Sequence, residues 1–122
     1  MGRGMTRAGV KRWKDFEREV ARELRKLAPG ARRCLQYQRD HGAPDVAAGA
    51  LWVECKSGAL RASLEAIYQQ AASKARGGSV VPAVVSKAGR RGPKLVTLAL
   101  EDFVRLARAT PKEQRRLWRA AR

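Results

Sequence analysis

Residues 42–56 read GAPDVAAGALWVECK, and this stretch decides the expected fold. A Pro-Asp pair opens a short extended segment, a turn centred on Gly49 follows, and a second strand completes the stretch. Side chains alternate across a strand, so Glu54 and Lys56 share one face. If the turn folds the first segment back beside the second, Asp45 lies next to Glu54. The sequence therefore predicts two carboxylates and a lysine in one place.

These residue types suit phosphate chemistry. Paired carboxylates offer the oxygen ligands that Mg²⁺ prefers, and a lysine can orient a water or offset phosphate charge. An acid and a base on the wet face of a strand are common, so Glu-x-Lys alone indicates no function. Together, Pro44, Asp45, an eight-residue spacer, Glu54 and Lys56 resemble the PD-(D/E)xK nuclease superfamily. The resemblance implies a metal held by Asp45, Glu54 and the main-chain carbonyl of Cys55, with Lys56 as a catalytic residue.

The composition points to a polyanionic partner. The 122 residues include 27 Lys and Arg against 11 Asp and Glu, which gives a net charge of +16. Such an excess produces self-repulsion that a polyanion would relieve. Nucleic acid fits because phosphate neutralisation releases counterions. A membrane surface is the alternative, but it calls for a helix with a broad apolar face opposite its basic face. The charge is spread along the whole chain, which favours nucleic acid and predicts no membrane association.

Length and cysteine usage predict a single intracellular domain. The chain is long enough for one modest core, and no apolar run approaches the roughly 18 residues of a membrane span. Residues 1–14 are basic but lack the apolar stretch of a secretory signal, which predicts a location in the cytoplasm or nucleoid, or in the host cytoplasm for a viral protein. Cys34 and Cys55 lie in separate segments with one histidine in the chain. This favours free thiols over a zinc site.

Hydrophobic periodicity and breakers predict an α/β fold. Residues 1–10 are expected to form a flexible basic arm and residues 11–122 a single nuclease domain. The expected elements, in order, are a helix from residue 11 to the Pro-Gly breaker at 29–30, strands at 31–38, 44–48 and 51–56, a helix at 60–74, strands at 80–85 and 95–100, and helices at 101–107 and 112–121. A mixed central sheet flanked by helices, with an extra C-terminal helix, follows from this order. It corresponds to the αβββαβ core of the resembled superfamily.

The resemblance also implies two site residues on helices. The superfamily commonly directs an acid of the first helix toward the metal, and Glu17 matches that position better than Glu19. A glutamine on the helix after the lysine strand often faces the catalytic cluster, and Gln70 matches better than Gln69. In the simpler interpretation, the acids pair with neighbouring arginines on the helix surface and the glutamines are ordinary surface residues.

Basic residues in two loops are candidate DNA contacts. The loop before Pro44 carries a lone histidine that could contact a phosphate or simply be solvated, and nothing in the sequence orients it as a general base. The basic loop at residues 86–94 has no Walker spacing, so backbone contact with nucleic acid is favoured over nucleotide binding. The predicted DNA-binding residues are Arg39, His41, Lys87, Arg90, Arg91 and Lys94.

Small size and dense positive charge make the chain similar to archaeal or phage-type Holliday junction resolvases. The resemblance implies a homodimer that makes paired nicks in four-way DNA junctions with Mg²⁺, for which Mn²⁺ would substitute. One alternative is another replication-repair nuclease of the superfamily that cuts flaps or forks. A second alternative is a non-catalytic basic protein that binds nucleic acid, with Glu54 and Lys56 as a surface pair.

Overall fold

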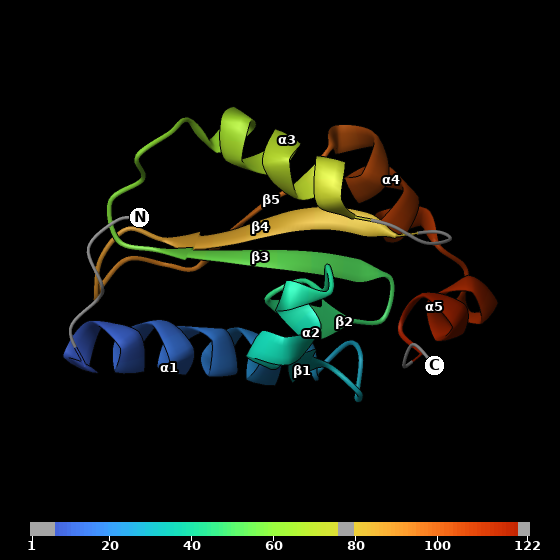
Figure 1. Ribbon diagram of the computed structural model, residues 1–122. Coiled ribbons are helices and arrows are strands. Elements are labelled where there is room, and N and C mark those ends of the chain that lie inside the picture. The colour runs from blue at the N-terminus through green and yellow to red at the C-terminus, as the bar shows by residue number, and fades with distance from the viewer. Residues whose placement is uncertain (1–6, 76–79, 120–122) are drawn as a thin grey trace.

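The computed structural model describes residues 7–75 and 80–119, which form an α/β fold around a five-stranded mixed sheet (Figure 1). The strands lie in the order β1-β2-β3-β4-β5, and only β3 and β4 run parallel. A helix connects these two strands, as a parallel crossover requires. The strands are β1 (Arg32–Arg33), β2 (Val46–Ala48), β3 (Leu51–Ser57), β4 (Val81–Lys87) and β5 (Leu95–Thr97).

The helices form layers on both faces of the sheet. One long helix lies along one face, another covers the opposite face, and two helices gather at one end (Figure 1). They are α1 (Arg7–Leu24) on the first face, α3 (Leu64–Lys74) on the second, the short α2 (Gln36–Asp40), and α4 (Leu100–Arg108) and α5 (Pro111–Leu117) at the end. The coarse α/β prediction is confirmed. Among the described helices, none combines the length and the apolar composition needed to cross a bilayer.

Helix α1 begins inside the segment predicted as a flexible arm. It starts at Arg7, four residues before the predicted start at Lys11, and residues 1–6 of the predicted arm lie outside the described residues. The packing of its apolar side chains on the sheet stabilises the helix, which therefore extends toward the N-terminus by one further, basic turn. Phe16, Val20 and Ala21 are buried with side chains of β2, β3 and β4 to form the main core, as the three- and four-residue periodicity predicts.

The hairpin of β2 and β3 is confirmed. Val46 pairs with Val53 and Ala48 with Leu51 across a turn at Gly49. Gly49 has φ +56°, in the left-handed region that side-chain-bearing residues avoid. A Cβ there would lie 2.3 Å from the main-chain oxygen of Leu117 in α5. The glycine therefore both closes the hairpin and lets the C-terminal helix approach it.

We expect Gly49→Ala to lower the free energy of unfolding by about 2–3 kcal/mol, because left-handed backbone strain adds to the clash with α5. Urea denaturation followed by circular dichroism measures the change. Gly89→Ala is the matched control, since Gly89 has no positive φ and no atom within 4 Å of an added Cβ. Equal effects of the two substitutions would contradict this explanation.

The strand predicted at residues 31–38 is wrong over most of its length. Only Arg32–Arg33 pairs with β2, and α2 then begins at Gln36. The loose alternation that suggested a strand does not correspond to burial, because Leu35 and Tyr37 are 62% and 71% exposed. The Leu35 N–H instead donates to Gln38 Oε1 at 2.9 Å. This local side-chain contact starts a helical turn in place of a ladder.

Pro82 lies within β4, where a missing N–H would ordinarily disrupt a sheet. Strand β5 pairs only with residues Val84 to Ser86 of β4, so Pro82 lies beyond its end, beside β3 alone. On the α3 face, Val84 is buried against Ile67 and Ala71. The predicted buried strand is confirmed, and the short β5 explains how it accommodates a proline.

The C-terminal elements differ from prediction mainly in their bounds. Strand β5 ends at Thr97, so it is shorter than the predicted 95–100. The last helix begins at Pro111 with the Thr110 hydroxyl accepting the Glu113 N–H, and ends at Leu117. Residues 120 and 121 of the predicted helix lie outside the described residues. Trp118 packs on a small cluster of alanines, which anchors this end of the chain: Ala28, Ala31 and Ala48.

Candidate active site

The carboxylates of Asp45 and Glu54 meet on the face of the sheet that carries α3. Val46 of β2 pairs with Val53 of β3. Asp45 precedes Val46 and Glu54 follows Val53, so the two acids lie opposite one another, one position further from the turn. The Cys55 N–H donates to Asp45 Oδ2 at 2.9 Å, which holds the aspartate against β3. Glu54 pairs in β4 with Val84, whose side chain is buried under α3. The structure therefore brings these two predicted site residues together.

The environment of the pair raises the pKa of the Glu54 carboxyl to about 7. Burial is the largest cause and the negative charge of Asp45 is the second, while the ammonium of Lys74 acts in the opposite direction. Both causes disfavour the ionised form. At neutral pH, the site thus holds two acids that resist being charged together. An additional positive charge would relieve this conflict.

The raised pKa predicts a defined dependence of stability on pH. Unfolded glutamate titrates near 4.5 and folded Glu54 near 7, so the folded state holds more protons between these values and stability falls as pH rises through that window. In metal-free buffer, we expect Glu54→Gln to unfold with a free energy about 1–2 kcal/mol higher than wild type at pH 8, after allowance for solvent screening.

Urea denaturation at pH 4.5 and pH 8 measures this difference. At pH 4.5 the two proteins should be of nearly equal stability, because the carboxyl is largely protonated in the folded state. A variant less stable than wild type at pH 8 would contradict the assignment.

A cavity of about 600 Å³ opens over the acid pair. It is lined by α2 and the loop after it, the β2–β3 hairpin and the end of α3: Arg39, Asp40, His41, Gly42, Ala43, Asp45, Trp52, Glu54, Ser73 and Lys74. The sequence prediction missed Lys74. Lys74 is the last residue of α3, the helix that follows the strand of Glu54. No local sequence pattern indicates that this end of the helix lies close to Glu54 in the fold.

Two other predicted catalytic residues do not line this cavity. Lys56 is exposed on the same strand face as Glu54, two residues further along β3. Gln70 is exposed on α3, as is the alternative Gln69. The ammonium that shares the cavity with both carboxylates is that of Lys74. The structure therefore does not place Lys56 or Gln70 among the residues that line this cavity, and their catalytic roles stay predictions.

Glu17 is fully buried beneath the site and not at the edge of an apolar stripe. Its Oε1 accepts from Arg33 Nε at 2.7 Å and from Arg39 Nη2. Arg39 Nη1 in turn lies 3.7 Å from Asp45 Oδ1. Glu17 thus reaches the acid pair through a guanidinium, and its role as a metal ligand stays a prediction. The alternative, Glu19, lies 3.4 Å from Lys94 and does not line the cavity.

Arg39 and His41 line the cavity, and their predicted contacts with nucleic acid stay a prediction. Arg39 is 10% exposed and lies 5.0 Å over the ring of Trp13, so most of its surface is held inside the protein. His41 Nδ1 lies 2.8 Å from the main-chain oxygen of Tyr37. Because a carbonyl can only accept, this nitrogen donates, and Nε2 of the neutral ring can accept a hydrogen bond. His41 is therefore oriented, which the sequence did not indicate.

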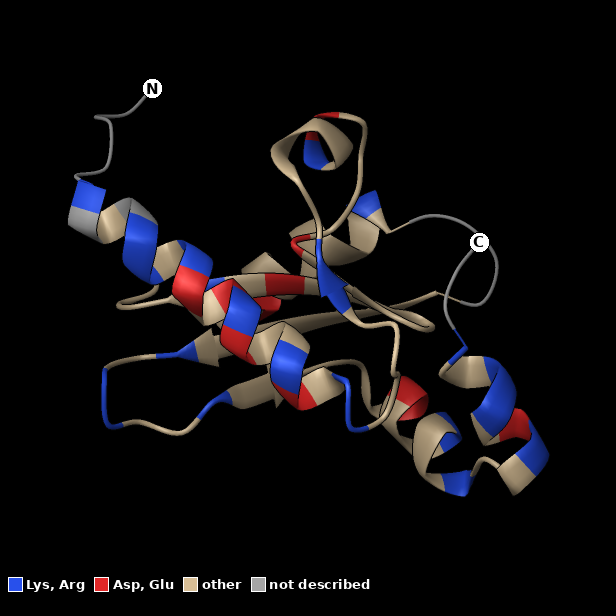
Figure 2. Cartoon of the chain, turned by 90° about the horizontal axis from the view of Figure 1, so that it is seen from below, with Lys and Arg blue, Asp and Glu red and all other residues tan. Residues whose placement is uncertain are grey.

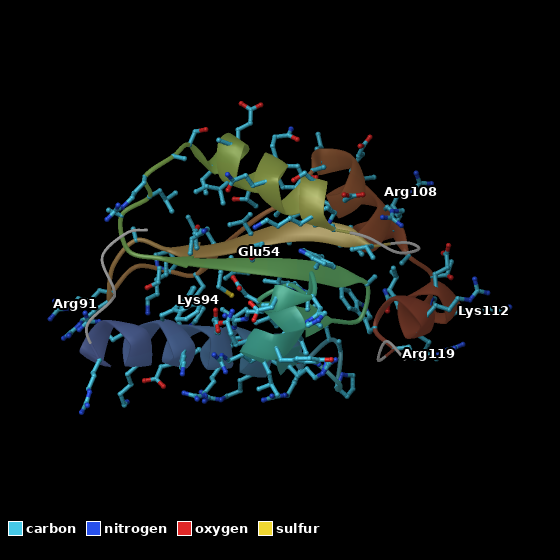
Figure 3. The ribbon with its side chains drawn as sticks, in the orientation of Figure 1. Glu54, Arg91, Lys94, Arg108, Lys112 and Arg119 are labelled. Carbon is cyan, nitrogen blue, oxygen red and sulfur yellow. The ribbon has the colours of Figure 1, made fainter. Side chains whose placement is uncertain are left out.

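The other predicted DNA contacts lie on the β4–β5 hairpin. Figure 3 shows Arg91 at one end of the molecule and Glu54 near the middle of the sheet, while Arg108, Lys112 and Arg119 lie at the other end. Arg90, Arg91 and Lys94 are exposed, and Lys87 is half-buried at the end of β4. Viewed toward the face that carries α1, basic residues recur along this helix and around the hairpin loop (Figure 2). The cationic surface is thus broad and extends well beyond the acid pair.

The acid pair fits a hard divalent cation. Mg²⁺ is commonly held by one or two carboxylates with water completing its shell, and Asp45 with Glu54 supplies that number. Among residues 7–75 and 80–119, no group of three His, Cys, Asp or Glu side chains comes together as a metal site. A cation there would depend on Asp45, Glu54 and the main-chain carbonyl of Cys55.

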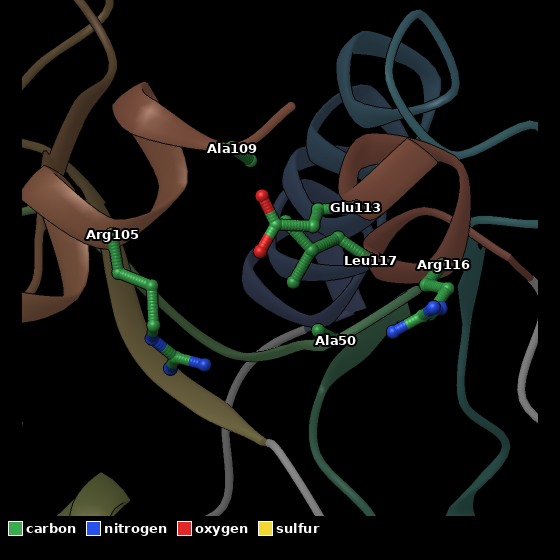
Figure 4. A pocket seen from close by; sticks show the side chains of 6 residues that line it. All are labelled: Ala50, Arg105, Ala109, Glu113, Arg116 and Leu117. Atoms are coloured by element: carbon green, nitrogen blue, oxygen red, sulfur yellow. The ribbon is translucent and has the colours of Figure 1, made fainter. Parts of the chain in front are cut away.

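A second cavity, between α4 and α5, has a different character. It has a volume of about 290 Å³ and places the carboxylate of Glu113 between Arg105 and Arg116 (Figure 4). The Glu113 carboxylate already accepts from the Thr110 N–H at 2.9 Å as part of the helix cap. Glu113 is the one acid among the residues that line this cavity, and two arginines line it as well, so the cavity lacks the acid pair found at Asp45 and Glu54.

Compared with protein-family models, curated proteins and solved structures, the chain gives no match.

Proposed function

We propose that the protein is a metal-dependent DNA endonuclease whose active site is built on Asp45 and Glu54. The observation that carries the proposal is that these two carboxylates lie side by side at the β2–β3 hairpin, Asp45 just before β2 and Glu54 on β3. They line a cavity that a lysine, an arginine and a histidine also line. Charge of both signs in one cavity suits a cation bridging acids to a phosphate. The site chemistry and the net charge of +16 support the same substrate class.

Each residue of the cavity has a defined task in this proposal. A Mg²⁺ ion held by Asp45 and Glu54 would neutralise the phosphodiester and acidify a bound water. Lys74 offsets the negative charge that develops on the phosphate. Arg39 keeps Asp45 in place through its contact at 3.7 Å. His41, whose Nδ1 donates to the Tyr37 carbonyl, would accept a hydrogen bond from the attacking water through Nε2.

The order of elements supports a core like that of the PD-(D/E)xK nucleases. A helix precedes three antiparallel strands, and a helix then leads to a parallel strand. Asp45 immediately precedes the second strand and Glu54 lies on the third, in the order of the predicted motif. The short α2 between β1 and β2 is an addition to that expected order.

The proposed substrate is branched DNA, with a four-way junction as the first choice and flaps or forks as the alternative. A cationic surface spread over α1 and the β4–β5 hairpin suits recognition of backbone shape more than base edges. One chain supplies one acid pair, so paired nicks would require two copies. The proposal therefore includes a homodimer.

The test is incubation of wild type with junction, flap and linear duplex DNA, in Mg²⁺, in Mn²⁺ and in EDTA. We expect nicking in either metal, fastest on the junction, and a loss of at least about 10³-fold in Asp45→Asn, since a metal ligand is removed while the fold is kept. Gel-shift binding of Asp45→Asn should stay within about threefold of wild type. Mg²⁺ should also raise the melting temperature of wild type at pH 8 more than that of Asp45→Asn.

A non-catalytic DNA-binding protein is the second candidate. It is favoured because, among the described residues, no three His, Cys, Asp or Glu side chains come together as a group that could hold a metal ion. Such a protein would bind DNA as wild type and as Asp45→Asn, cut in neither case, and gain no stability from Mg²⁺. These three results together would overturn the nuclease proposal.

A further inference from the structure

Helix α4 is amphipathic yet buries none of its nine residues. Leu100, Phe103 and Ala107 recur at three- and four-residue steps and so share one side of the helix. Leu100 is 76% exposed and Phe103 is 55% exposed. A helix of this kind ordinarily buries its apolar side. Within the described part of the chain, no element does so.

The apolar side of α4 continues onto the sheet. A cavity of about 420 Å³ separates α4 from the strands and is lined almost entirely by apolar side chains. We define the α4–β5 apolar face as Val96, Leu98, Leu100, Phe103, Leu106 and Ala107. Val96 belongs to β5, the edge strand, and is 57% exposed. Contiguous apolar surfaces of this kind mark interaction sites.

The charge of the segment that carries this face favours a second copy of the chain as the partner that covers it. Residues 95–108 carry two acids and two arginines, so this segment is neutral within a chain of net charge +16. Two copies would repel one another over most of their surfaces, and this face is a place where they can meet without that cost. DNA, by contrast, would gain nothing from a neutral apolar surface.

The charges of α4 are also self-complementary. Glu101 lies in the first turn and Arg108 in the last turn. They are seven residues apart, about two helical turns, and therefore lie on the same flank of the apolar side. When two α4 helices pack antiparallel around a two-fold axis, equivalent flanks meet, so Glu101 of each copy faces Arg108 of the other. The helix dipoles are antiparallel in this arrangement as well.

We propose that the α4–β5 apolar face is the interface of a homodimer, in which α4 packs antiparallel on its symmetry mate. This inference deepens the homodimer of the proposed function by naming its interface, and its readout is molecular mass. DNA nicking is measured separately, so failure of the interface and failure of the nuclease activity can be told apart. Sedimentation velocity from about 1 to about 100 µM protein is expected to show the mass of two chains, in reversible equilibrium with one. Phe103→Glu is expected to weaken association at least about 100-fold, because it places a charge in the apolar centre.

A charge exchange tests the geometry. Glu101→Arg and Arg108→Glu are each expected to weaken the dimer about 3–10-fold, and their combination to recover wild-type affinity within about twofold. Glu65→Arg is the matched control for Glu101→Arg, because Glu65 is an exposed acid in the first turn of α3 and the two substitutions change the net charge by the same amount. It should leave association within about twofold of wild type.

Circular dichroism confirms that each variant is folded, which separates lost association from lost structure. A wild-type mass of one chain at every concentration would overturn the proposal and assign the face to another partner. A dimer that persists in Phe103→Glu would also overturn it, as would a charge exchange that fails to restore affinity.

Discussion

Glu17→Ala is expected to lower the free energy of unfolding by about 3–5 kcal/mol, the largest stability effect among the predictions made for this protein. The carboxylate is fully buried and contacts two guanidinium groups that are themselves 19% and 10% exposed. Removing it leaves Arg33 and Arg39 partly buried without their shared counter-charge. The loss should appear as a lower urea midpoint with an unchanged slope.

The matched control is Glu23→Ala on the same helix. Glu23 is 58% exposed and forms an ion pair with the exposed Lys26 at 3.0 Å, so its removal should change stability by less than about 0.5 kcal/mol. A change below about 1 kcal/mol for Glu17→Ala would contradict a structural role.

Glu17→Gln separates a structural role from a metal-binding one. If Glu17 serves only to hold the two arginines, this variant loses stability but gains as much from Mg²⁺ as wild type does. If Glu17 is a ligand, the Mg²⁺-dependent rise in melting temperature shrinks as well.

Lys74→Ala is expected to slow DNA nicking by about 10²–10³-fold, as removal of a preorganised positive group from a transition state does in other enzymes. The lysine lines the same cavity as both carboxylates and lowers the pKa of Glu54. Lys56→Ala is expected to have the smaller effect, because Lys56 is exposed and does not line that cavity. Single-turnover nicking of a labelled junction measures both rates.

Lys112→Ala controls for the loss of one positive charge, since Lys112 is an exposed lysine on α5, far from Glu54 in the view of Figure 3. It should bind and nick at rates within about threefold of wild type. If Lys56→Ala slows nicking more than Lys74→Ala does, the catalytic lysine is Lys56, as the sequence motif predicts, and the assignment of Lys74 from the cavity is wrong.

The hairpin and its acid pair could be predicted because both depend on neighbouring residues. The turn at Gly49 and the two-residue alternation of β3 place Asp45 beside Glu54 with no information from the rest of the chain. The periodicity of α1 and the breakers around α3 are local in the same sense. Their bounds moved by a few residues because helix ends depend on what packs nearby.

The strand predicted at residues 31–38 failed for a related reason. Alternation of apolar residues indicates a strand only when one face becomes buried, and Leu35 and Tyr37 stay exposed. Nothing in the eight residues themselves shows whether a core will cover them. A contact of three residues' span, from Leu35 to Gln38, then decides the local structure.

By itself, the sequence determined the α/β class, the hairpin that pairs Asp45 with Glu54, and the dense positive charge, because periodicity, turn chemistry and composition act over short stretches of chain. Only the tertiary structure decided that Glu17 is buried between two arginines, that Lys74 rather than Lys56 shares the cavity of the acids, and that α4 leaves its apolar side uncovered. Each of these depends on contacts between segments distant in the chain. Such contacts depend on how helices and strands pack against one another, so they cannot be predicted from short stretches of sequence.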